Sequence, residues 1–332
     1  MKPDLIEVFF RDGSYALDFG LTRCQMEVIG GAMEAAGFPY VEIGHGYGLG
    51  AARKGFPPAA ETDETYLAAA RSVFKNTRYG TFFIPGVGTP EDMKMAHGHG
   101  ISFISIGQNI TAVEEARPAV ELAKELGLHT TVCMMKAHVL PLPEFTNLVS
   151  HVQSWGPDCI CIMDSAGTMV PAEVQERVTA VCRSGPATAG FHGHNNLSLA
   201  VANSLAAFTA GAGRIDVSLG GIGRSAGNTA TEALTALLRR MGRETSPSLE
   251  GVEAVLESAA MEEMPLGNAP AMDDILLGIY GLHSSISGIV ETAVERHGVP
   301  AARLYEAVAR HNPVNPTPDE IERLARELKG DR

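Results

Sequence analysis

Short apolar runs alternate with longer amphipathic segments along most of this chain. The runs are rich in branched and aromatic residues, as buried parallel strands are. The segments between them repeat apolar residues at helical spacing, and some begin with Thr-Pro-Glu or Pro-Ala-Glu, which favours a helix N-terminus. Strands are predicted at residues 5–9, 40–43, 79–84, 101–106, 129–134, 159–163, 188–192 and 214–218. Helices are predicted at 22–36, 63–76, 112–126, 143–155, 171–182, 196–210 and 227–240.

Eight strand–helix units predict an α/β fold with a parallel sheet. A closed (β/α)8 TIM barrel fits better than an open sheet, because an open sheet that binds nucleotides carries a glycine-rich phosphate loop in its first turn. That turn here reads Arg-Asp-Gly-Ser-Tyr. We expect a barrel domain over 1–245 and a C-terminal α-helical extension over 246–332 packed on the barrel. Within the extension we expect helices over 276–294 and 318–328, the second with Thr317 as its N-cap.

The carboxyl ends of barrel strands carry the chemistry of such folds, and two histidines end the seventh predicted strand. His192 and His194 are two residues apart, so their imidazoles face the same side of the strand. Asp12, after the first strand, can add a carboxylate, and three ligands leave coordination positions open on a divalent metal. His97 and His99 have the same spacing but precede the fourth strand, on the opposite face of the barrel. We expect them to be surface residues.

Composition excludes several classes of function. The chain has 26 Lys and Arg against 39 Asp and Glu, a net charge of −13, and no basic run. We therefore expect no nucleic-acid or anionic-membrane surface, although a small anionic substrate is compatible with this charge. The sequence has no long apolar run and no secretory start, and its five cysteines form no C-x-x-C pair. These features predict a cytoplasmic protein with reduced thiols.

Five motifs occur together in barrel order. They are Arg11-Asp12-Gly13, His45-Gly46-x-Gly48-Leu49, Asp164-Ser165-Ala166-Gly167, the stretch Phe-His-Gly-His-Asn-Asn-Leu-Ser-Leu at 191–199, and Ala202-Asn203-Ser204. With these motifs the chain resembles the 4-hydroxy-2-oxovalerate aldolase family. That family is a branch of the metal-dependent pyruvate lyases, which include relatives of hydroxymethylglutaryl-CoA lyase and isopropylmalate synthase. The likeness runs from Ile6 through the helical tail.

The resemblance implies that Asp12, His192 and His194 hold a divalent ion. Mn2+ is the ion expected, with Mg2+, Co2+ and Zn2+ as alternatives. It also implies that Arg11 lies beside the metal-bound oxygen of a small 2-oxo acid. The chemistry agrees, because breaking a carbon–carbon bond next to a carbonyl leaves an enolate whose oxygen needs a Lewis acid and a fixed cation.

Two positions depart from the family pattern. The family places a histidine, the proposed base for the substrate hydroxyl, where this chain has Tyr15. It places a tyrosine before the Ser-Ser of the tail, where this chain has His283. If both residues face one pocket, His283 remains available as the base. The alternative is that the base is lost and His283 only packs on a helix. The segment 311–320 also lacks the glycines of family members that pass an aldehyde to a dehydrogenase, so we expect no channelling partner.

Other polar residues follow strand ends. Ser165 and His45 are candidate substrate-binding residues. Asn228 is expected to cap a helix, and the alternative is a further polar group near the metal, because related acyl-transferring enzymes have an asparagine after a similar glycine-rich segment. Lys136 could form a Schiff base, but a complete metal site makes that mechanism less favoured. Arg53 and Lys54 are expected to lie in a solvated loop.

The sequence therefore predicts a metal-dependent carbon–carbon lyase that cleaves or forms a 4-hydroxy-2-oxo acid through a pyruvate enolate. The second hypothesis is a Claisen condensation of an acyl-CoA with a 2-oxo acid, as in isopropylmalate synthase. The third is a non-catalytic barrel that binds a 2-oxo acid. We also expect a homo-oligomer, most simply a dimer.

Overall fold

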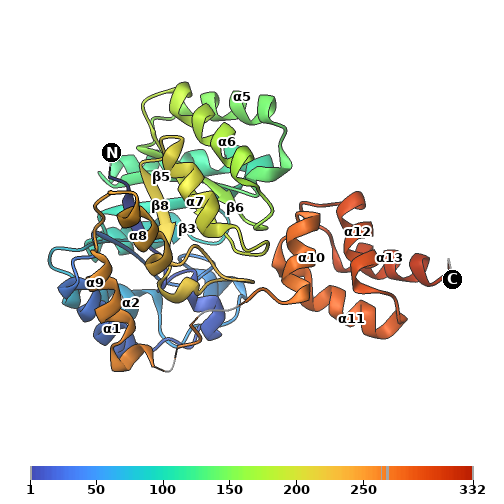
Figure 1. Ribbon diagram of the computed structural model, residues 1–332, viewed down its shortest axis with the longest axis horizontal. Helices are drawn as coiled ribbons and strands as arrows, with labels where there is room; N and C mark the ends of the chain where they lie inside the picture. The colour runs from blue at the N-terminus through green and yellow to red at the C-terminus, as the bar shows by residue number, and fades with distance from the viewer. Residues whose placement is uncertain (1, 263, 267–268, 331–332) are drawn as a thin grey trace.

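Eight parallel strands form a closed barrel in the computed structural model, which describes residues 2–262, 264–266 and 269–330 (Figure 1). Each strand pairs with the next in sequence, and β8 pairs with β1. The strands are β1 Asp4–Glu7, β2 Tyr40–Ile43, β3 Arg78–Phe83, β4 Phe103–Asn109, β5 His129–Met135, β6 Cys159–Asp164, β7 Thr188–Gly193 and β8 Arg214–Val217. The predicted TIM barrel is confirmed, and every strand overlaps its predicted range.

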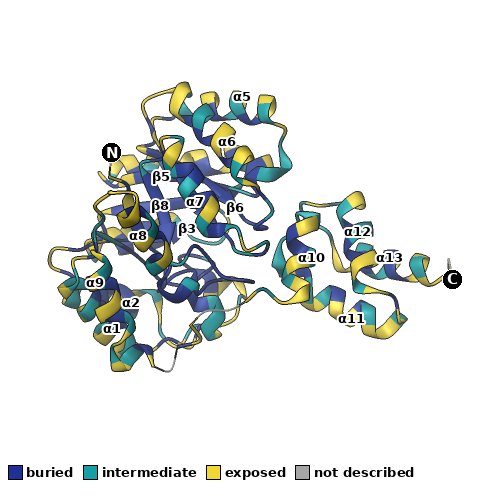
Figure 2. Ribbon diagram, viewed as in Figure 1, coloured by how far each residue is buried: buried dark blue, intermediate teal, exposed yellow. Residues whose placement is uncertain are grey.

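Eight helices follow the strands and cover the outside of the barrel. They are α1 Arg23–Ala35, α2 Asp63–Val73, α3 Pro90–Gly98, α4 Arg117–Glu125, α5 Leu142–Gln153, α6 Pro171–Ser184, α7 Ala200–Thr209 and α8 Thr231–Arg240. Capping residues start several of them, as at Thr22 and Thr89, whose hydroxyls accept the first free backbone N–H groups. Apolar faces of strands and helices meet in one core (Figure 2).

Three predicted helices begin too early. The range 112–126 starts as a 3-10 turn, because Ala112 leaves helical geometry with φ −132°. The ranges 196–210 and 227–240 become helical at Ala200 and Thr231. The residues before these two helices have side chains that bond to other loops, as Asn196 does to Ser225. Such bonds compete with helix formation.

Large aromatic rings fill the inside of the barrel opposite glycines. A Cβ on Gly80 would overlap the carbonyl oxygen and the ring of Phe103, and one on Gly107 would overlap the ring of Phe82. The same interior holds Arg214, which donates to Thr131 and Ser105 on other strands. The barrel is therefore a packed core beneath its mouth and not a pore.

The chain after the barrel forms two helical parts. Helix α9, Leu249–Leu256, lies against α1 and α8 on the barrel wall. Helices α10 Met272–Tyr280, α11 Ser287–His297, α12 Ala301–His311 and α13 Pro318–Gly330 bury a second apolar cluster of their own. Figure 1 shows these four helices as a group beside the barrel. A domain boundary near residue 245 stays a prediction. In the described part of the chain, no helix has the length and apolarity to cross a membrane.

The single helix predicted over 276–294 is wrong. Helix α10 ends at Tyr280 because Gly281 adopts the left-handed conformation, φ +65°, and caps it. The chain then passes through a 3-10 turn, Ser284–Ile286, before α11 begins. This break places the Gly281 carbonyl oxygen 3.0 Å from Nε2 of His138, which anchors the helical group to the barrel mouth. The second predicted helix, over 318–328, is confirmed as α13, and Thr317 accepts a bond from the Glu320 N–H at its start.

Replacing Gly80 by alanine tests the packing of the barrel interior. We expect Gly80→Ala to lower the free energy of unfolding by ~1–3 kcal/mol, because the added methyl meets backbone that cannot move aside. Gly31→Ala is the control. Gly31 is exposed in α1 with nothing within 4 Å of its Cβ position, so we expect a gain of ~0.5–1 kcal/mol. Denaturant unfolding measures both, and equal stabilities would contradict this view of the interior.

Candidate metal and substrate site

Asp12, His192 and His194 converge at the carboxyl end of the barrel. Their potential ligand atoms lie within 4.8 Å of one another, and all three residues are buried. Asp12 follows β1, His192 lies in β7, and His194 directly follows that strand. Strand alternation puts both imidazoles on the inner side. His97 and His99 lie instead at the end of α3, where His97 is exposed.

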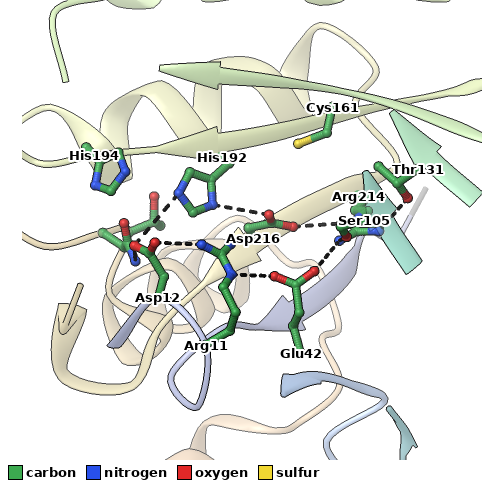
Figure 3. A network of polar contacts seen from close by, with 12 residues as sticks. Arg11, Asp12, Glu42, Ser105, Thr131, Cys161, His192, His194, Arg214 and Asp216 are labelled. Carbon is green, nitrogen blue, oxygen red and sulfur yellow. Dashed lines mark hydrogen bonds and ion pairs between the residues drawn. The ribbon is translucent and has the colours of Figure 1, made fainter. Parts of the chain in front are cut away.

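Each histidine is oriented by a partner on its Nδ1 atom. His192 Nδ1 lies 3.2 Å from Oδ2 of Asp216 (Figure 3). His194 Nδ1 lies 3.1 Å from the carbonyl oxygen of Gly227. Both acceptors place the ring proton on Nδ1 and leave the lone pair on Nε2, the arrangement that metal-binding histidines use. Nε2 of His192 is buried and has no hydrogen-bond partner among the described residues.

The carboxylate of Asp12 is held between two donors. Arg11 Nη1 donates to Oδ1 at 2.6 Å, and Asn228 Nδ2 donates to Oδ2 at 2.6 Å. Burial alone would raise the pKa of Asp12, but the charge of Arg11 beside it holds that pKa well below its usual range. The expectation that Asn228 caps a helix is wrong: α8 begins after Ala230, and Asn228 instead positions a metal-ligand candidate.

An anionic oxygen beside two imidazole nitrogens fits a divalent cation. Burial and Arg224 lower the pKa of His194 well below its usual value, so its ring is neutral and able to bind metal. Nε2 of His192 has no hydrogen-bond partner among the described residues, and it lies 4.0 Å from Oδ2 of Asp12. A bound cation would satisfy this nitrogen, and we therefore regard these residues as a metal site.

Two nitrogens of the Arg11 guanidinium are fixed by hydrogen bonds, and the third has no hydrogen-bond partner among the described residues. Its Nε donates to Oε2 of Glu42 at 2.6 Å, its Nη1 donates to Asp12, and its guanidinium carbon lies 4.7 Å from the Phe82 ring centroid. Nη2 is buried and makes no hydrogen bond within the described chain. Two carboxylates and a ring thus aim a permanent cation, and its free N–H groups remain available to a ligand.

A cavity of about 360 Å³ opens above Arg11 and Asp12 at the barrel mouth. Tyr15 and His283 both line it, although they lie far apart in sequence. Ser165 lines it as well, with its hydroxyl accepting from the Lys136 N–H at 2.9 Å. His283 could replace the missing base only if Tyr15 and His283 face one pocket. The structure shows that both residues do line the same pocket.

The pKa values of Tyr15 and His283 are shifted in opposite directions. Burial raises the pKa of Tyr15 above its usual range, and its ring packs on those of Phe19 and Tyr47. Burial, with Arg224 and Lys136 nearby, lowers the pKa of His283 well below its usual value. Nδ1 of His283 accepts from the Ser285 N–H at 3.1 Å, so the neutral ring carries its proton on Nε2.

His45 lies outside this cavity. Its Nε2 lies 2.9 Å from the Pro57 carbonyl oxygen, its Nδ1 accepts from the Tyr47 N–H, and its ring stacks on Phe19 at 4.2 Å. It therefore holds the loop after β2 and borders a neighbouring cavity. Arg53 and Lys54, in the same loop, are exposed as expected, and Arg53 pairs with Asp92.

Two important residues were missed by sequence reasoning. Asp216 orients His192, and Arg224 places its Nη2 2.9 Å from Nε2 of His194. Asp216 carried a signal, since it is an acid at an inward position of a short apolar strand. Arg224 carried none, because its loop is defined only by tertiary contacts such as the bond from its Nη1 to Ser284 Oγ at 2.5 Å.

The chain matches a protein-family model and individual relatives that agree with each other. Residues 2–258 match the model of the HMGL-like family. The 4-hydroxy-2-oxovalerate aldolase 2 of Comamonas testosteroni is 34% identical over 326 residues, which cover 98% of this chain and 93% of the relative. The 4-hydroxy-2-oxovalerate aldolase 1 of Burkholderia cenocepacia is 36% identical over 329 residues, covering 98% and 95%.

Solved structures match the fold at lower identity. The carboxyl transferase domain of Rhizobium etli pyruvate carboxylase superposes with a TM-score of 0.76 at 17% identity, over 99% of this chain and 60% of that one. The T882A variant of Rhizobium etli pyruvate carboxylase with the allosteric activator acetyl coenzyme A gives a TM-score of 0.79 at 18% identity, over 99% of this chain and 32% of that one. These likenesses support the barrel and its helical tail as a fold.

Loss of one imidazole should remove the metal. We expect His192→Ala to retain little bound divalent ion after dialysis against metal-free buffer. We expect Asp216→Asn to bind the ion ~10–100-fold more weakly, because an uncharged amide replaces the carboxylate that orients His192. His97→Ala is the control, since it removes an exposed histidine of the same sequence spacing. Metal content by elemental analysis and affinity by calorimetry are the measurements. Full metal occupancy in His192→Ala would disprove the site.

Proposed function

This chain belongs to the HMGL-like family, and from that premise we propose that it is a divalent-metal-dependent aldolase. It is a carbon–carbon lyase that cleaves a 4-hydroxy-2-oxo acid to pyruvate and an aldehyde, or joins the two. The names of its relatives support this reaction. The observation that carries the proposal is a pair of buried nitrogens without hydrogen-bond partners among the described residues. Nη2 belongs to Arg11, which lines the cavity, and Nε2 of His192 lies 4.0 Å from Asp12, which also lines it.

The reaction moves one proton and one bonding pair of electrons. The 4-hydroxyl loses its proton, its oxygen becomes the carbonyl of the aldehyde, and the C3–C4 bond breaks. The electrons of that bond form the enolate of pyruvate, and a proton added at its C3 carbon gives pyruvate, which balances the proton lost by the hydroxyl. Asp12, His192 and His194 would hold a divalent ion, which would supply Lewis acidity at the 2-oxo group.

Arg11 stabilises the charge that develops on the enolate oxygen. Its free Nη2 donates to this oxygen, while Glu42 and Asp12 hold the other nitrogens in place. The guanidinium is oriented before the substrate binds, so the reaction requires no rearrangement of the cation. Its charge does not titrate near neutral pH.

His283 faces the 4-hydroxyl end of the substrate in this proposal. Its pKa is low, and its Nδ1 accepts the Ser285 N–H, so Nε2 donates a hydrogen bond to a substrate oxygen. To take the hydroxyl proton as a base, the ring must carry its own proton on Nδ1. It would then lose the bond from the Ser285 N–H and donate instead to Ser285 Oγ, which lies 2.9 Å from Nδ1. Because the base role costs the Ser285 N–H its acceptor, we propose a positioning hydrogen bond from Nε2. Tyr15 lines the same cavity and contacts the substrate in this proposal.

The metal is proposed to be Mn2+. One carboxylate and two imidazoles leave the remaining positions to oxygen atoms of substrate and water, and an oxygen-rich shell suits Mn2+ and Mg2+. Co2+ and Zn2+ suit the two imidazoles and belong in the same comparison. We also propose that Ser165 contacts the 2-oxo acid, since it lines the cavity. We also propose that the protein is a homodimer. We propose no channelling dehydrogenase as its partner, because prolines stiffen the segment 311–320.

Replacing Arg11 by lysine tests the role of the guanidinium. We expect Arg11→Lys to lower kcat for aldol cleavage by ~10²–10³-fold, because an ammonium group cannot keep two bonds to carboxylates and still reach the enolate oxygen. Metal-dependent exchange of the pyruvate methyl protons, followed by NMR, should fall in parallel. Arg53→Lys, at an exposed arginine outside the cavity, should match the parent. Near-parental turnover in Arg11→Lys would remove it from the mechanism. A parent protein that neither exchanges nor cleaves with any metal would refute the aldolase.

The roles of His283 and Tyr15 separate in three variants. We expect His283→Ala to slow cleavage while metal binding is retained, and His283→Gln to recover part of the rate, because its amide can donate as Nε2 does. Tyr15→Phe should be milder than His283→Ala. If His283→Gln is as slow as His283→Ala, the histidine acts as a base. A severe Tyr15→Phe defect beside an unaffected His283→Ala would assign the chemistry to Tyr15.

A further inference from the structure

Two cations at the cavity have no carboxylate partner within the described chain. Arg224 donates from Nη1 to Ser284 Oγ and from Nη2 to the Ser165 carbonyl oxygen at 2.8 Å, and its Nη2 also meets His194. Lys136 is 8% exposed, and its ammonium donates to the Val314 carbonyl oxygen and to Asn315 Oδ1. All of these acceptors are uncharged.

Lys136 is buried and Arg224 is half-buried. The buried arginines of the barrel interior are, by contrast, neutralised by acids. Arg11 is bonded to Glu42 and Asp12, and Arg214 is bonded to Asp216. Asp12 is the one acid among the residues that line the cavity, and it serves Arg11 and the metal site. The cavity therefore carries surplus positive charge, and buried cations without counterions are costly unless a ligand supplies the anions.

The positions of the two cations differ along the cavity. Arg224 contacts His194 and Ser165, so it lies next to the metal site, where the carboxylate beside the 2-oxo group must lie. Lys136 lies toward the helical tail, bonded to the loop between α12 and α13. A simple 4-hydroxy-2-oxo acid has one carboxylate, which Arg224 accommodates. Lys136 is then left without an anion.

We propose that the substrate is a dicarboxylic 4-hydroxy-2-oxo acid, whose aldehyde half carries a second carboxylate bound by Lys136. This inference rests on the proposed aldolase and specifies its substrate class. The aldehyde released or consumed is then an acidic aldehyde. The metal and Arg11 act on the 2-oxo end, and Lys136 selects the distal end.

Lys136 is held in a conformation that suits this task. Its backbone is left-handed, φ +56°, which is uncommon for a residue with a side chain, and its N–H donates to Ser165 Oγ. Such strain is found where a side chain must be presented in one direction. An ammonium has three donors, and the protein uses two of them, so one N–H remains for a carboxylate. Burial and the nearby Arg224 lower the pKa of Lys136 to about 8, so the group is still mostly protonated at neutral pH.

In this proposal, the tail segment 311–320 positions the ammonium group of Lys136. Val314 and Asn315 belong to the stretch 311–320, where the sequence departs from the family pattern. Their oxygens hold the ammonium of Lys136 at the edge of the cavity. The departure is therefore linked to the substrate that the site accepts.

Binding of unreactive 2-oxo acids tests the proposal without catalysis. The probes are 2-oxo monocarboxylic acids and 2-oxo dicarboxylic acids of five, six and seven carbons, which lack the 4-hydroxyl and cannot be cleaved. Calorimetry with the Mn2+-loaded full chain should show tighter binding of a dicarboxylic acid at one or more lengths. Lys136→Met should remove this preference, lowering dicarboxylate affinity by ~10–100-fold, the range for a lost hydrogen bond to a charged group, with little change for the monocarboxylates.

A structural role for Lys136 predicts a different result. If the ammonium only anchors the tail loop, Lys136→Met lowers affinity for both ligand classes by the same factor, which overturns the proposal. Equal binding of both classes by the parent also overturns it. Lys54→Met, at an exposed lysine outside the cavity, should leave the preference intact. Steady-state cleavage of 4-hydroxy-2-oxo acids with and without a terminal carboxylate should show the same preference in kcat/KM.

The pyruvate exchange assay distinguishes failure of the proposed substrate class from failure of the proposed aldolase activity. Exchange by the parent without any preference for dicarboxylic acids refutes the substrate class and leaves the aldolase standing. Absence of both exchange and cleavage refutes the aldolase, and the binding comparison then still decides whether the cavity selects a dicarboxylic 2-oxo acid.

Discussion

A buried chain of charge pairs across the barrel interior is the interaction on which the site depends. Glu42 holds Arg11, Arg11 holds Asp12, and Asp216 joins His192 to Arg214 (Figure 3). Burial makes each charge expensive to leave alone, so every member requires its neighbours. The strands bring these residues together, and the charge pairs then fix the side-chain rotamers. A site for metal and substrate is thereby oriented before either binds.

Two nitrogens of this network are suited to hold a metal and a substrate. Nε2 of His192 and Nη2 of Arg11 are buried without a hydrogen-bond partner among the described residues, whereas the neighbouring nitrogens of both side chains are bonded. The imidazole nitrogen can bind a cation, and the guanidinium N–H groups can donate to an anionic oxygen. In the proposed reaction, a divalent ion and the 2-oxo acid would satisfy these two nitrogens.

The helical tail completes the substrate cavity of the barrel. His283 and Asn315 line the cavity, Ser284 bonds to Arg224, and Gly281 bonds to His138. In the proposed reaction, the barrel carries the residues for bond cleavage, and the tail contributes to the end of the cavity that would receive the rest of the substrate. Changes in the tail can alter substrate choice while the metal site stays the same.

The barrel and the metal-ligand candidates could be predicted from local sequence patterns. Strand residues alternate and helices repeat with period 3.6, so these patterns predict the eight units and the common orientation of His192 and His194. The same patterns missed the helix break at Gly281, because a continuous apolar stripe runs through the glycine cap. The surroundings of the ligands could not be predicted in this way, since they are set by tertiary contacts. Asp216, Arg224 and Asn228 act through contacts between distant segments, and whether a cation has a counterion depends on those contacts, not on spacing along the chain.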